Sequence, residues 1–515
     1  MTPVGGKTNP DLEAAGGERP AGRPTPPRRP GAGWAGPWGA RAAGTLRTHW
    51  LVAVLLAAGL ALRAATQVGY RPALLYIDTL KYLYGEYPGS DPLGYRVVLK
   101  LILPFGDLGT VAAIQHLLGL AMAVALYTVL LRRGAARWLA ALAVAPLLLD
   151  AYQLHMEQMI MPDVWFEAAI VAGLAVLLWR PAVRWPAVVA AGLIIGSSAT
   201  IRQVGEILVL PAVLYLIVAG GGWRRVIGQS AALAVAFVLP ILGYCGVSYA
   251  RTGHFWLSGG QPNVGRMAAA ADCATLVLPP AARPLCPTPG EQARGPDWLE
   301  HSAHSPLHVA FVPPGKSRHH LIKVLGSAVE HQQPARVVVS ILRDSVRLFA
   351  LSRAPLQGVT PIARWQFQTS YPVYPPWVTV GGGNAIVIGL QRKAYGLVRT
   401  STLSPSYGGT AQVDRPAAAF LRAYQLDGGY APGPLLALFT LAGLAGSVLA
   451  LMRRRAAGSR QLALACLLFT GTAAAILLAS DVFEFSWRYQ LPALVTLPPA
   501  GVLGICAILR QRQAG

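Results

Sequence analysis

Charged residues are scarce in this 515-residue chain, and acidic residues are scarcer than basic ones. Only 13% of the residues are charged, with 22 Asp and Glu against 44 Lys and Arg, whereas 54% are hydrophobic. Together with a mean hydropathy of +0.44, this shortage of charge excludes an ordinary soluble protein. The excess of positive charge does not indicate nucleic-acid binding, because the basic residues are dispersed along the chain rather than collected in one region.

The chain contains many long apolar runs. They recur with lengths of about 17–24 residues, which is enough for a helix to cross a bilayer. We therefore predict an α-helical polytopic membrane protein with about ten transmembrane helices. The predicted spans cover residues 48–68, 108–131, 137–153, 161–180, 184–201, 205–221, 226–249, 433–452, 460–480 and 488–509.

Acidic residues are absent from every second connection between the predicted spans. Because Lys and Arg accumulate in cytoplasmic loops, we predict that these connections and both termini face the cytoplasm. The Ala-, Arg- and Gly-rich composition favours a bacterial plasma membrane. The basic residues of these connections and of the C-terminal tail are Arg132, Arg133, Arg137, Arg180, Arg184, Arg224, Arg225, Arg453, Arg454, Arg455, Arg460, Arg510 and Arg512.

Four regions follow from this arrangement: 1–47, 48–249, 250–432 and 433–515. The first is a basic tail, rich in Pro and Gly, that we predict to be disordered in the cytoplasm. The second and fourth hold the spans. The third is predicted to be a large extracytoplasmic insertion of mixed structure. Cys273 and Cys286 lie in this insertion, where they either pair as a disulfide or remain free thiols.

Polar side chains gather at the predicted outer ends of the spans, in the segments 76–96, 150–163, 200–206 and 481–492. Ionisable groups at membrane depth are costly, so they usually line a cavity and mark function. Arginines are typical ligands of a phosphate-like anion, and a carboxylate can accept a proton. The first segment continues into Val97–Phe105, which is too short to span and is predicted to be an interfacial helix.

Several short motifs in these segments follow the pattern of one class of membrane enzyme. They are Asp78, Pro88-Gly89, Pro92-Leu93-Gly94-Tyr95, Gln115-His116-Leu117-Leu118-Gly119, Glu157, Arg202 and Arg488-Tyr489-Gln490-Leu491-Pro492. With them the chain resembles the GT-C superfamily of polytopic glycosyltransferases, which use polyprenyl-phosphate-linked sugars as donors. It is most similar to bacterial relatives of protein O-mannosyltransferases and aminoarabinose transferases. The resemblance covers residues 48–249 and 480–509.

The resemblance implies transfer of the sugar with inversion, with the lipid phosphate as the leaving group. It implies that Asp78 is the catalytic base and that Glu157 is a second catalytic carboxylate. Arg202, Arg488 and Tyr489 would bind the donor phosphate. The chain lacks the paired Asp-Glu of many members after its first span, so a divalent cation, Mg or Mn, remains open. Further substrate contacts are predicted at Lys81, Tyr82, Arg96, Asp163 and Glu484.

The sugar, of the mannose or arabinose class, would pass to a glycan, lipid or protein acceptor outside the cell. One alternative is a transporter or flippase of lipid-linked glycans, for which the same charged cavity would serve. Against it, the sequence shows no broken helix pairs and no related halves. A second alternative is a membrane scaffold that binds a cell-envelope component without catalysis, which leaves the set of Asp78, Arg202 and Arg488 without a purpose.

Overall fold

The computed structural model describes residues 47–84, 92–259, 263–371, 377–380, 384–387, 407–409, 411–452 and 457–512. The predicted tail up to residue 46, the Pro88-Gly89 motif and Arg453–Arg455 lie outside the described residues. The chain forms two compact units, Met1–Trp50 and Leu51–Gly515. Only residues 47–50 of the first unit are described, so the fold below is that of the second.

Six described helices are long and apolar enough to cross a membrane, which confirms the predicted class of helical polytopic membrane protein. They are α2 (Trp50–Gly69), α5 (Leu108–Arg133), α11 (Trp223–Thr252), α19 (Gly433–Leu451), α20 (Ala457–Asp481) and α21 (Pro492–Arg512). Shorter helices fill the other predicted spans. They are α6 (Arg137–Leu149), α7 (Ala151–Gln158), α8 (Asp163–Leu178), α9 (Trp185–Ile201), η1 (Gln203–Leu208) and α10 (Val209–Ala219). The count of ten spans therefore remains a prediction.

The predicted span 137–153 is not one straight helix. Helices α6 and α7 meet at a 52° bend, and counting the pair as one span brings the candidate number to seven. Asp150 lies at the bend, where its carboxylate caps α7 by accepting from the N–H of Tyr152 at 2.9 Å. The sequence-based expectation of no broken helices is thus wrong at this position, because a side-chain cap starts a new helix there.

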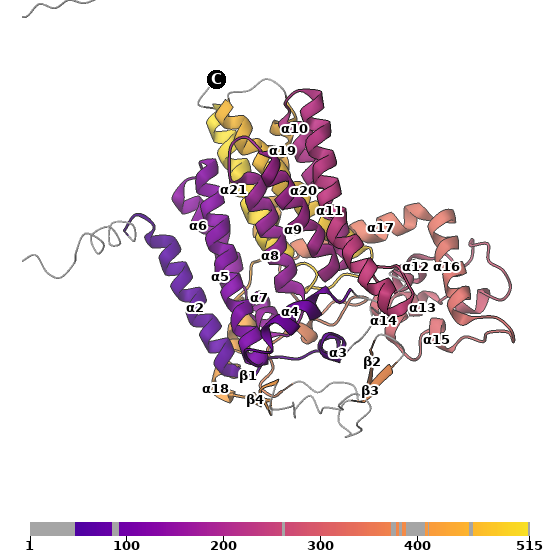
Figure 1. Cartoon of the computed structure of the whole chain (residues 1–515). Coiled ribbons are helices and arrows are strands. Elements are labelled where there is room, and N and C mark those ends of the chain that lie inside the picture. The colour runs from indigo at the N-terminus through magenta and orange to yellow at the C-terminus, as the bar shows by residue number, and fades with distance from the viewer. Residues whose placement is uncertain are drawn as a thin grey trace, which may run out of the picture. The chain divides into compact units, whose positions relative to one another are not determined.

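The helices pack closely because small residues face one another. Helix α9 packs between α8 and α11, and α21 packs against α19 and α20, as Figure 1 shows. A Cβ added at Gly196 would overlap the backbone of Phe237 on α11, and one at Gly504 would overlap that of Ala442 on α19. Glycine at these positions lets helix backbones approach.

Two short helices follow α2. They are α3 (Ile77–Tyr84) and α4 (Gly94–Ile102). Helix α4 is the predicted interfacial element, although it begins three residues earlier than Val97. Its apolar side chains Val97 and Leu101 are 58% and 67% exposed, as expected for a helix that lies in the interface.

The region 250–432 divides into two parts. Residues 264–337 enclose a hydrophobic core of their own, whereas residues from Leu348 to Ala431 join the core of the helix bundle. Cys273 and Cys286 form a disulfide in the first part. The elements are α12 (Val264–Ala270), η2 (Arg283–Leu285), α13 (Pro289–Gln292), α14 (Gly295–His301), α15 (Pro306–Val309), α16 (Arg318–Gln332), α17 (Pro334–Ser345), η3 (Val346–Phe349), η4 (Ile362–Trp365) and α18 (Arg415–Leu426).

Strands are few among the described residues. β1 (Tyr70–Arg71) pairs antiparallel with β4 (Gln412–Val413), and β2 (Trp377–Val380) pairs antiparallel with β3 (Asn384–Val387). The first pair ties the end of α2 to the segment before α18, and so brings the region 250–432 to the loop that precedes α3 and Asp78.

Arginines at one end of the bundle bind backbone carbonyls of helix ends and loops. Arg133 donates to the carbonyl of Leu178 at 2.6 Å, Arg225 to that of Val183 at 2.8 Å and Arg510 to that of Gly134 at 2.9 Å. The last carbonyls of a helix have no partner within it and carry partial negative charge. Arg133 and Arg510 thus stabilise the carbonyl ends of α8 and α5, whereas Arg225 binds the loop between α8 and α9.

Candidate active site

The loop after α2 is fixed by the segment that follows α7. The N–H of Leu74 donates to the carbonyl of Gln158, and the N–H of Ile160 donates to the carbonyl of Leu74, both at 3.0 Å. The hydroxyl of Thr79 donates to the carbonyl of Ile160 at 3.0 Å and accepts from the N–H of Tyr76 at 2.9 Å. These bonds hold the first turn of α3, and therefore Asp78, in place.

Asp163 and Arg488 form the centre of the cluster. Asp163 is the first residue of α8, and Arg488 lies just before α21. The guanidinium of Arg488 donates from Nε to Oδ1 of Asp163 at 3.0 Å and from Nη2 to Oδ2 at 2.9 Å. Arg202, the residue that ends α9, also donates to Oδ1 of Asp163. Two arginines from distant segments thus share one carboxylate.

Asp78 lies at the accessible edge of this cluster, with its side chain 22% exposed. Its carboxylate pairs with Nζ of Lys81 at 2.9 Å and with Nη1 of Arg488 at 3.4 Å. Burial favours the neutral acid, but Lys81 and then Arg488 outweigh it and hold the pKa of Asp78 well below its usual range. Asp78 is therefore an ionised carboxylate at neutral pH.

The cluster carries one net positive charge, because its ion pairs join three cations and two carboxylates. The members are Asp78, Lys81, Asp163, Arg202 and Arg488. The two carboxylates bring the pKa of Arg488 well above its ordinary value despite the opposing effect of burial. A site with surplus positive charge and forked guanidinium groups is suited to an added anion such as a phosphate.

Aromatic rings enclose the arginines. The ring of Tyr489 lies 4.8 Å from the guanidinium carbon of Arg202 and 5.4 Å from that of Arg488. Trp365 of η4 lies 5.3 Å from the guanidinium of Arg488. Its indole N–H donates to the hydroxyl of Ser486 at 3.1 Å. These cation–π contacts hold the guanidinium planes in position.

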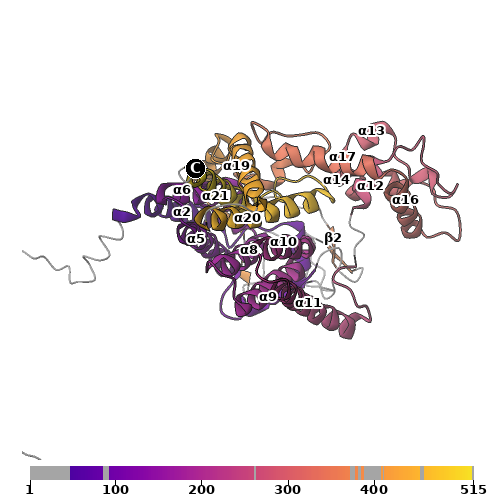
Figure 2. The ribbon, with the colours of Figure 1, turned by 90° about the horizontal axis from the view of Figure 1, so that it is seen from above.

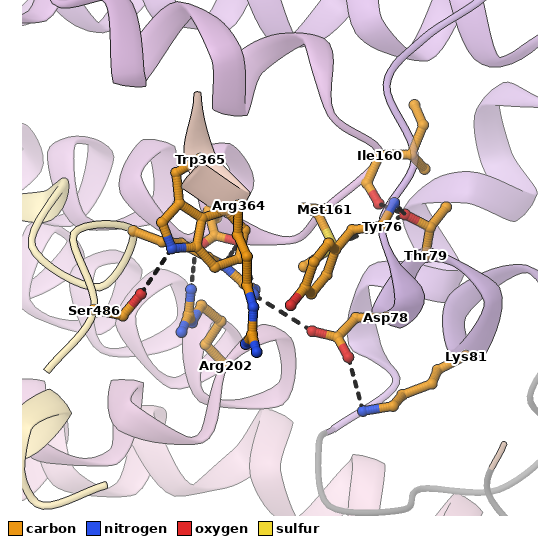
Figure 3. A network of polar contacts seen from close by, with 12 residues as sticks. Tyr76, Asp78, Thr79, Lys81, Ile160, Met161, Arg202, Arg364, Trp365 and Ser486 are labelled. Atoms are coloured by element: carbon orange, nitrogen blue, oxygen red, sulfur yellow. Dashed lines mark hydrogen bonds and ion pairs between the residues drawn. The ribbon is translucent and has the colours of Figure 1, made fainter. Parts of the chain in front are cut away.

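The side chains of the region 250–432 thus reach the site. Figure 3 shows Lys81 on one side of Asp78, and Arg202, Arg364 and Trp365 on the other. The ring of Tyr76 lies 5.1 Å from that of Trp365. Sequence reasoning missed Trp365 and Ser486. No signal in the sequence marks Trp365, since it lies in a region without helical periodicity.

Glu157 belongs to a different cluster, which is sealed inside the bundle. Its carboxylate pairs with Nη2 of Arg63 at 2.7 Å and with Nδ1 of His116 at 2.9 Å. The second ring nitrogen of His116 lies 2.8 Å from Oε1 of Gln158. All four side chains are buried, with Glu157 fully so. The structure does not bring Glu157 together with Asp78.

The remaining predicted site residues are dispersed. Tyr82 is buried with its ring edge against Tyr95, at 5.2 Å between ring centres, and Arg96 is half-buried on α4. Glu484 is half-buried beside the ion pair of Arg364 and Asp297, whose atoms lie 3.1 Å apart.

Glu484 has an unusual protonation behaviour for a carboxylate. Burial, with the negative charges of Asp297 and Glu300 added to it, raises the pKa of Glu484 to about 8. It is therefore largely neutral at pH 7, and it can donate a hydrogen bond there. Among the described residues, no group of three or more His, Cys, Asp or Glu is placed to hold a metal ion.

The solved structures that match this chain include the three described below, whereas no protein-family model and no curated protein matches. The Saccharomyces cerevisiae protein O-mannosyltransferase Pmt1–Pmt2 complex bound to the sugar donor matches with a TM-score of 0.34 and 16% identity over 44% of this chain and 38% of that one. The Archaeoglobus fulgidus oligosaccharyltransferase AglB, in complex with an inhibitory peptide and a dolichol-phosphate, matches with a TM-score of 0.39 and 10% identity over 91% of this chain and 51% of that one.

ArnT from Cupriavidus metallidurans, bound to undecaprenyl phosphate, gives a TM-score of 0.31 and 14% identity over 91% of this chain and 79% of that one. The chain thus spans about two fifths of the yeast protein and half of AglB. All three structures belong to the GT-C class that the sequence motifs resemble. At TM-scores below 0.5, these similarities carry no argument about the activity of this chain.

Proposed function

We propose that this protein is a membrane glycosyltransferase that moves a sugar from a polyprenyl-phosphate donor to a hydroxyl of an extracytoplasmic acceptor. The observation that supports it best is the cluster of Asp78, Asp163, Arg202 and Arg488, which four distant segments build at one end of the bundle. It offers an ionised, partly exposed carboxylate beside two guanidinium groups. A proton acceptor next to a phosphate-binding pair is what this transfer requires.

In the proposed reaction, Asp78 takes the proton of the acceptor hydroxyl as its oxygen attacks the anomeric carbon. The bond between that carbon and the phosphate oxygen breaks, and its electron pair leaves with the lipid phosphate. The sugar is thereby inverted. Arg202 and Arg488 stabilise the charge that develops on the phosphate, and the position of Tyr489 against both guanidinium groups suits a contact with the same phosphate. Because a phosphate is a good leaving group, positioning and charge stabilisation supply most of the catalysis.

Donor binding would also make Asp78 a stronger base. Arg488 contacts both Asp78 and Asp163. A phosphate that binds Arg488 competes with its contact to Asp78 and so raises the pKa of Asp78 toward the ordinary range of a carboxylate. Asp78 would then become a stronger proton acceptor when the donor is present. In this proposal Asp163 orients the arginines, and Lys81 keeps Asp78 ionised and directed toward the accessible edge.

Glu157, Tyr82 and Arg96 have no part in the proposed reaction. The carboxylate of Glu157 is fully buried and bound by Arg63 and His116, and Tyr82 is 3% exposed. Glu484 lies beside Arg364, and a neutral carboxyl suits a contact with an acceptor hydroxyl. The proposed sugar is of the mannose or arabinose class, the acceptor is a glycan, lipid or protein, and the location is the outer face of a bacterial plasma membrane.

The test is transfer of labelled sugar by the purified full-length protein. Synthetic polyprenyl-phosphate mannose and polyprenyl-phosphate arabinose are supplied in detergent with a short alkyl glycoside as acceptor, and release of polyprenyl phosphate is measured as well. Asp78→Asn should lower transfer or donor hydrolysis by about 100-fold or more, since it removes a general base. It should still bind the donor, because the arginines remain.

Asp427→Asn is the matched control, since Asp427 is an exposed residue at the end of α18. It should leave transfer unchanged. Equal activity of Asp78→Asn and wild type would contradict the proposed base. A wild-type protein that binds a donor without transfer or hydrolysis, and moves it across vesicle membranes, would favour the flippase instead.

A further inference from the structure

Helix α17 (Pro334–Ser345) has two apolar faces, and only one of them is covered. Val337 is buried and Ile341 is partly buried, both against the core of residues 264–337. At 100° per residue, Ala335, Val338, Val339 and Leu342 fall within an arc of about 100° on the other side. Val338, Val339 and Leu342 are 53%, 54% and 53% exposed.

Beyond the helix the same apolar character continues. Val346, in the turn η3 that follows α17, is 61% exposed, and Leu351 is 83% exposed. Exposed apolar side chains occur singly on most proteins, but a continuous stripe along a helix indicates a surface that contacts something apolar.

Basic side chains border this stripe. Arg336 and Arg343 lie at one edge of the arc, and both are exposed. The side chain of Arg336 is 55% exposed although it pairs with Asp272 at 3.5 Å. An apolar face flanked by arginines is typical of a helix that lies on an anionic bilayer surface, where the apolar side enters the acyl region and the guanidinium groups reach the headgroups.

The position of α17 agrees with a location at the bilayer surface. Its last residue, Ser345, donates to Oδ2 of Asp481 at 2.7 Å, and Asp481 ends the membrane-spanning helix α20. The backbone of Ala350 lies against Gly433, the first residue of α19. Figures 1 and 2 show α17 lying across the direction of α20. The helix therefore lies at the level where two spans meet the edge of the membrane.

A neighbouring span also has exposed apolar side chains. Leu438, Leu441 and Val448 of α19 are 64%, 64% and 56% exposed. On a membrane-spanning helix such side chains face lipid. Because η3, which follows α17 directly, packs on α19, the uncovered face of α17 belongs to an element next to this span.

We propose that α17 is an interfacial helix that rests on the bilayer, on the same side as the Asp78 cluster, with Arg336 and Arg343 contacting anionic headgroups. The occupant of its apolar face is lipid rather than a protein. This inference does not depend on the proposed transfer reaction. It gives the region 250–432 an attachment to lipid in addition to its contacts with the helix bundle.

The test measures the depth of a nitroxide attached to Leu342→Cys in the full-length protein, reconstituted into phosphatidylcholine vesicles with or without phosphatidylglycerol. Collision rates with oxygen, which concentrates in the acyl region, are compared with those of a water-soluble nickel complex. Glu330→Cys on the polar helix α16 is the matched control, since Glu330 is also exposed. Wild type, whose three free thiols are buried, gives the labelling background.

At position 342 oxygen collisions should exceed nickel collisions several-fold, and the order should reverse at position 330. Phosphatidylglycerol should increase the depth at position 342, and adding Arg343→Gln should remove that increase. Water access at position 342 equal to that at position 330 would overturn the proposal. Shielding from both reagents would overturn it too, because a protein surface or a second copy would then cover the stripe.

Discussion

Among the buried arginine–carboxylate clusters of the described residues, the one around Glu157 and the one around Asp163 differ in how accessible they are to a substrate. In one, Arg63 and His116 bind Glu157, and every side chain is at most 6% exposed. In the other, Arg488 joins Asp163 to Asp78, whose side chain is 22% exposed, next to Lys81 at 23%. Both contain ionisable groups near the ends of spans. Buried charge therefore marks a candidate reaction site only where a substrate can approach it.

The sharpest contrast is expected in stability. Glu157→Gln leaves the charge of Arg63 without a counterion, and breaking a buried ion pair in this way should cost about 3–5 kcal/mol. Asp78→Asn should cost far less, since the carboxylate is partly exposed and Arg488 keeps Asp163. Thermal unfolding in detergent can be followed with a thiol-reactive dye, because Cys245, Cys466 and Cys506 are buried in the folded protein.

A double variant sharpens this prediction. Arg63→Met combined with Glu157→Leu removes both charges, so it should be more stable than Glu157→Gln alone. If Glu157→Gln instead unfolds at the temperature of wild type and loses all transfer, Glu157 is catalytic after all, and the comparison between the two clusters fails.

A smaller effect is expected from Arg488→Lys. Arg488 uses Nε and both Nη atoms to bind Asp163 and Asp78 together, and a single ammonium group cannot span both carboxylates. The loss of these charged hydrogen bonds should lower kcat/KM for the donor by about 100-fold. Steady-state transfer assays measure it. Arg225→Lys, at the opposite end of the bundle, is the control and should keep full activity, and an equal loss there would point to folding.

The smallest effect concerns pH. The pKa of Glu484 is raised to about 8 in the folded protein, while an unfolded Glu ionises near pH 4.3. Between these values the folded state holds a proton that the unfolded state has lost, so this group makes stability fall as the pH rises from about 4.3 to 8. Glu484→Gln should flatten that part of the profile of melting temperature against pH. An unchanged slope would show that Glu484 ionises normally.

Much of the site could be predicted because span ends on one side of a membrane must lie near one another. Asp163 begins one helix, Arg202 ends the next and Arg488 precedes the last, and their convergence follows from the alternation of spans. The buried position of Glu157, apart from Asp78, could not be predicted, because the sequence does not show that a bend at Asp150 turns α7 into the bundle. Trp365 was not predicted, because its contacts with Arg488 and Ser486 join segments that are far apart in the sequence.

The bend at Asp150 has a consequence for the order in which this protein is made. The carboxylate of Asp150 is fully buried, and it binds Arg353 at 2.8 Å and the N–H of Ala431 at 2.9 Å. Ribosomes produce these partners long after Asp150, since domains form from the N-terminus during synthesis. Until residue 431 has emerged, the incomplete bundle contains the carboxylate of Asp150 without these two partners, so that water must solvate it. The early helices can therefore reach their final packing only when the last third of the chain arrives.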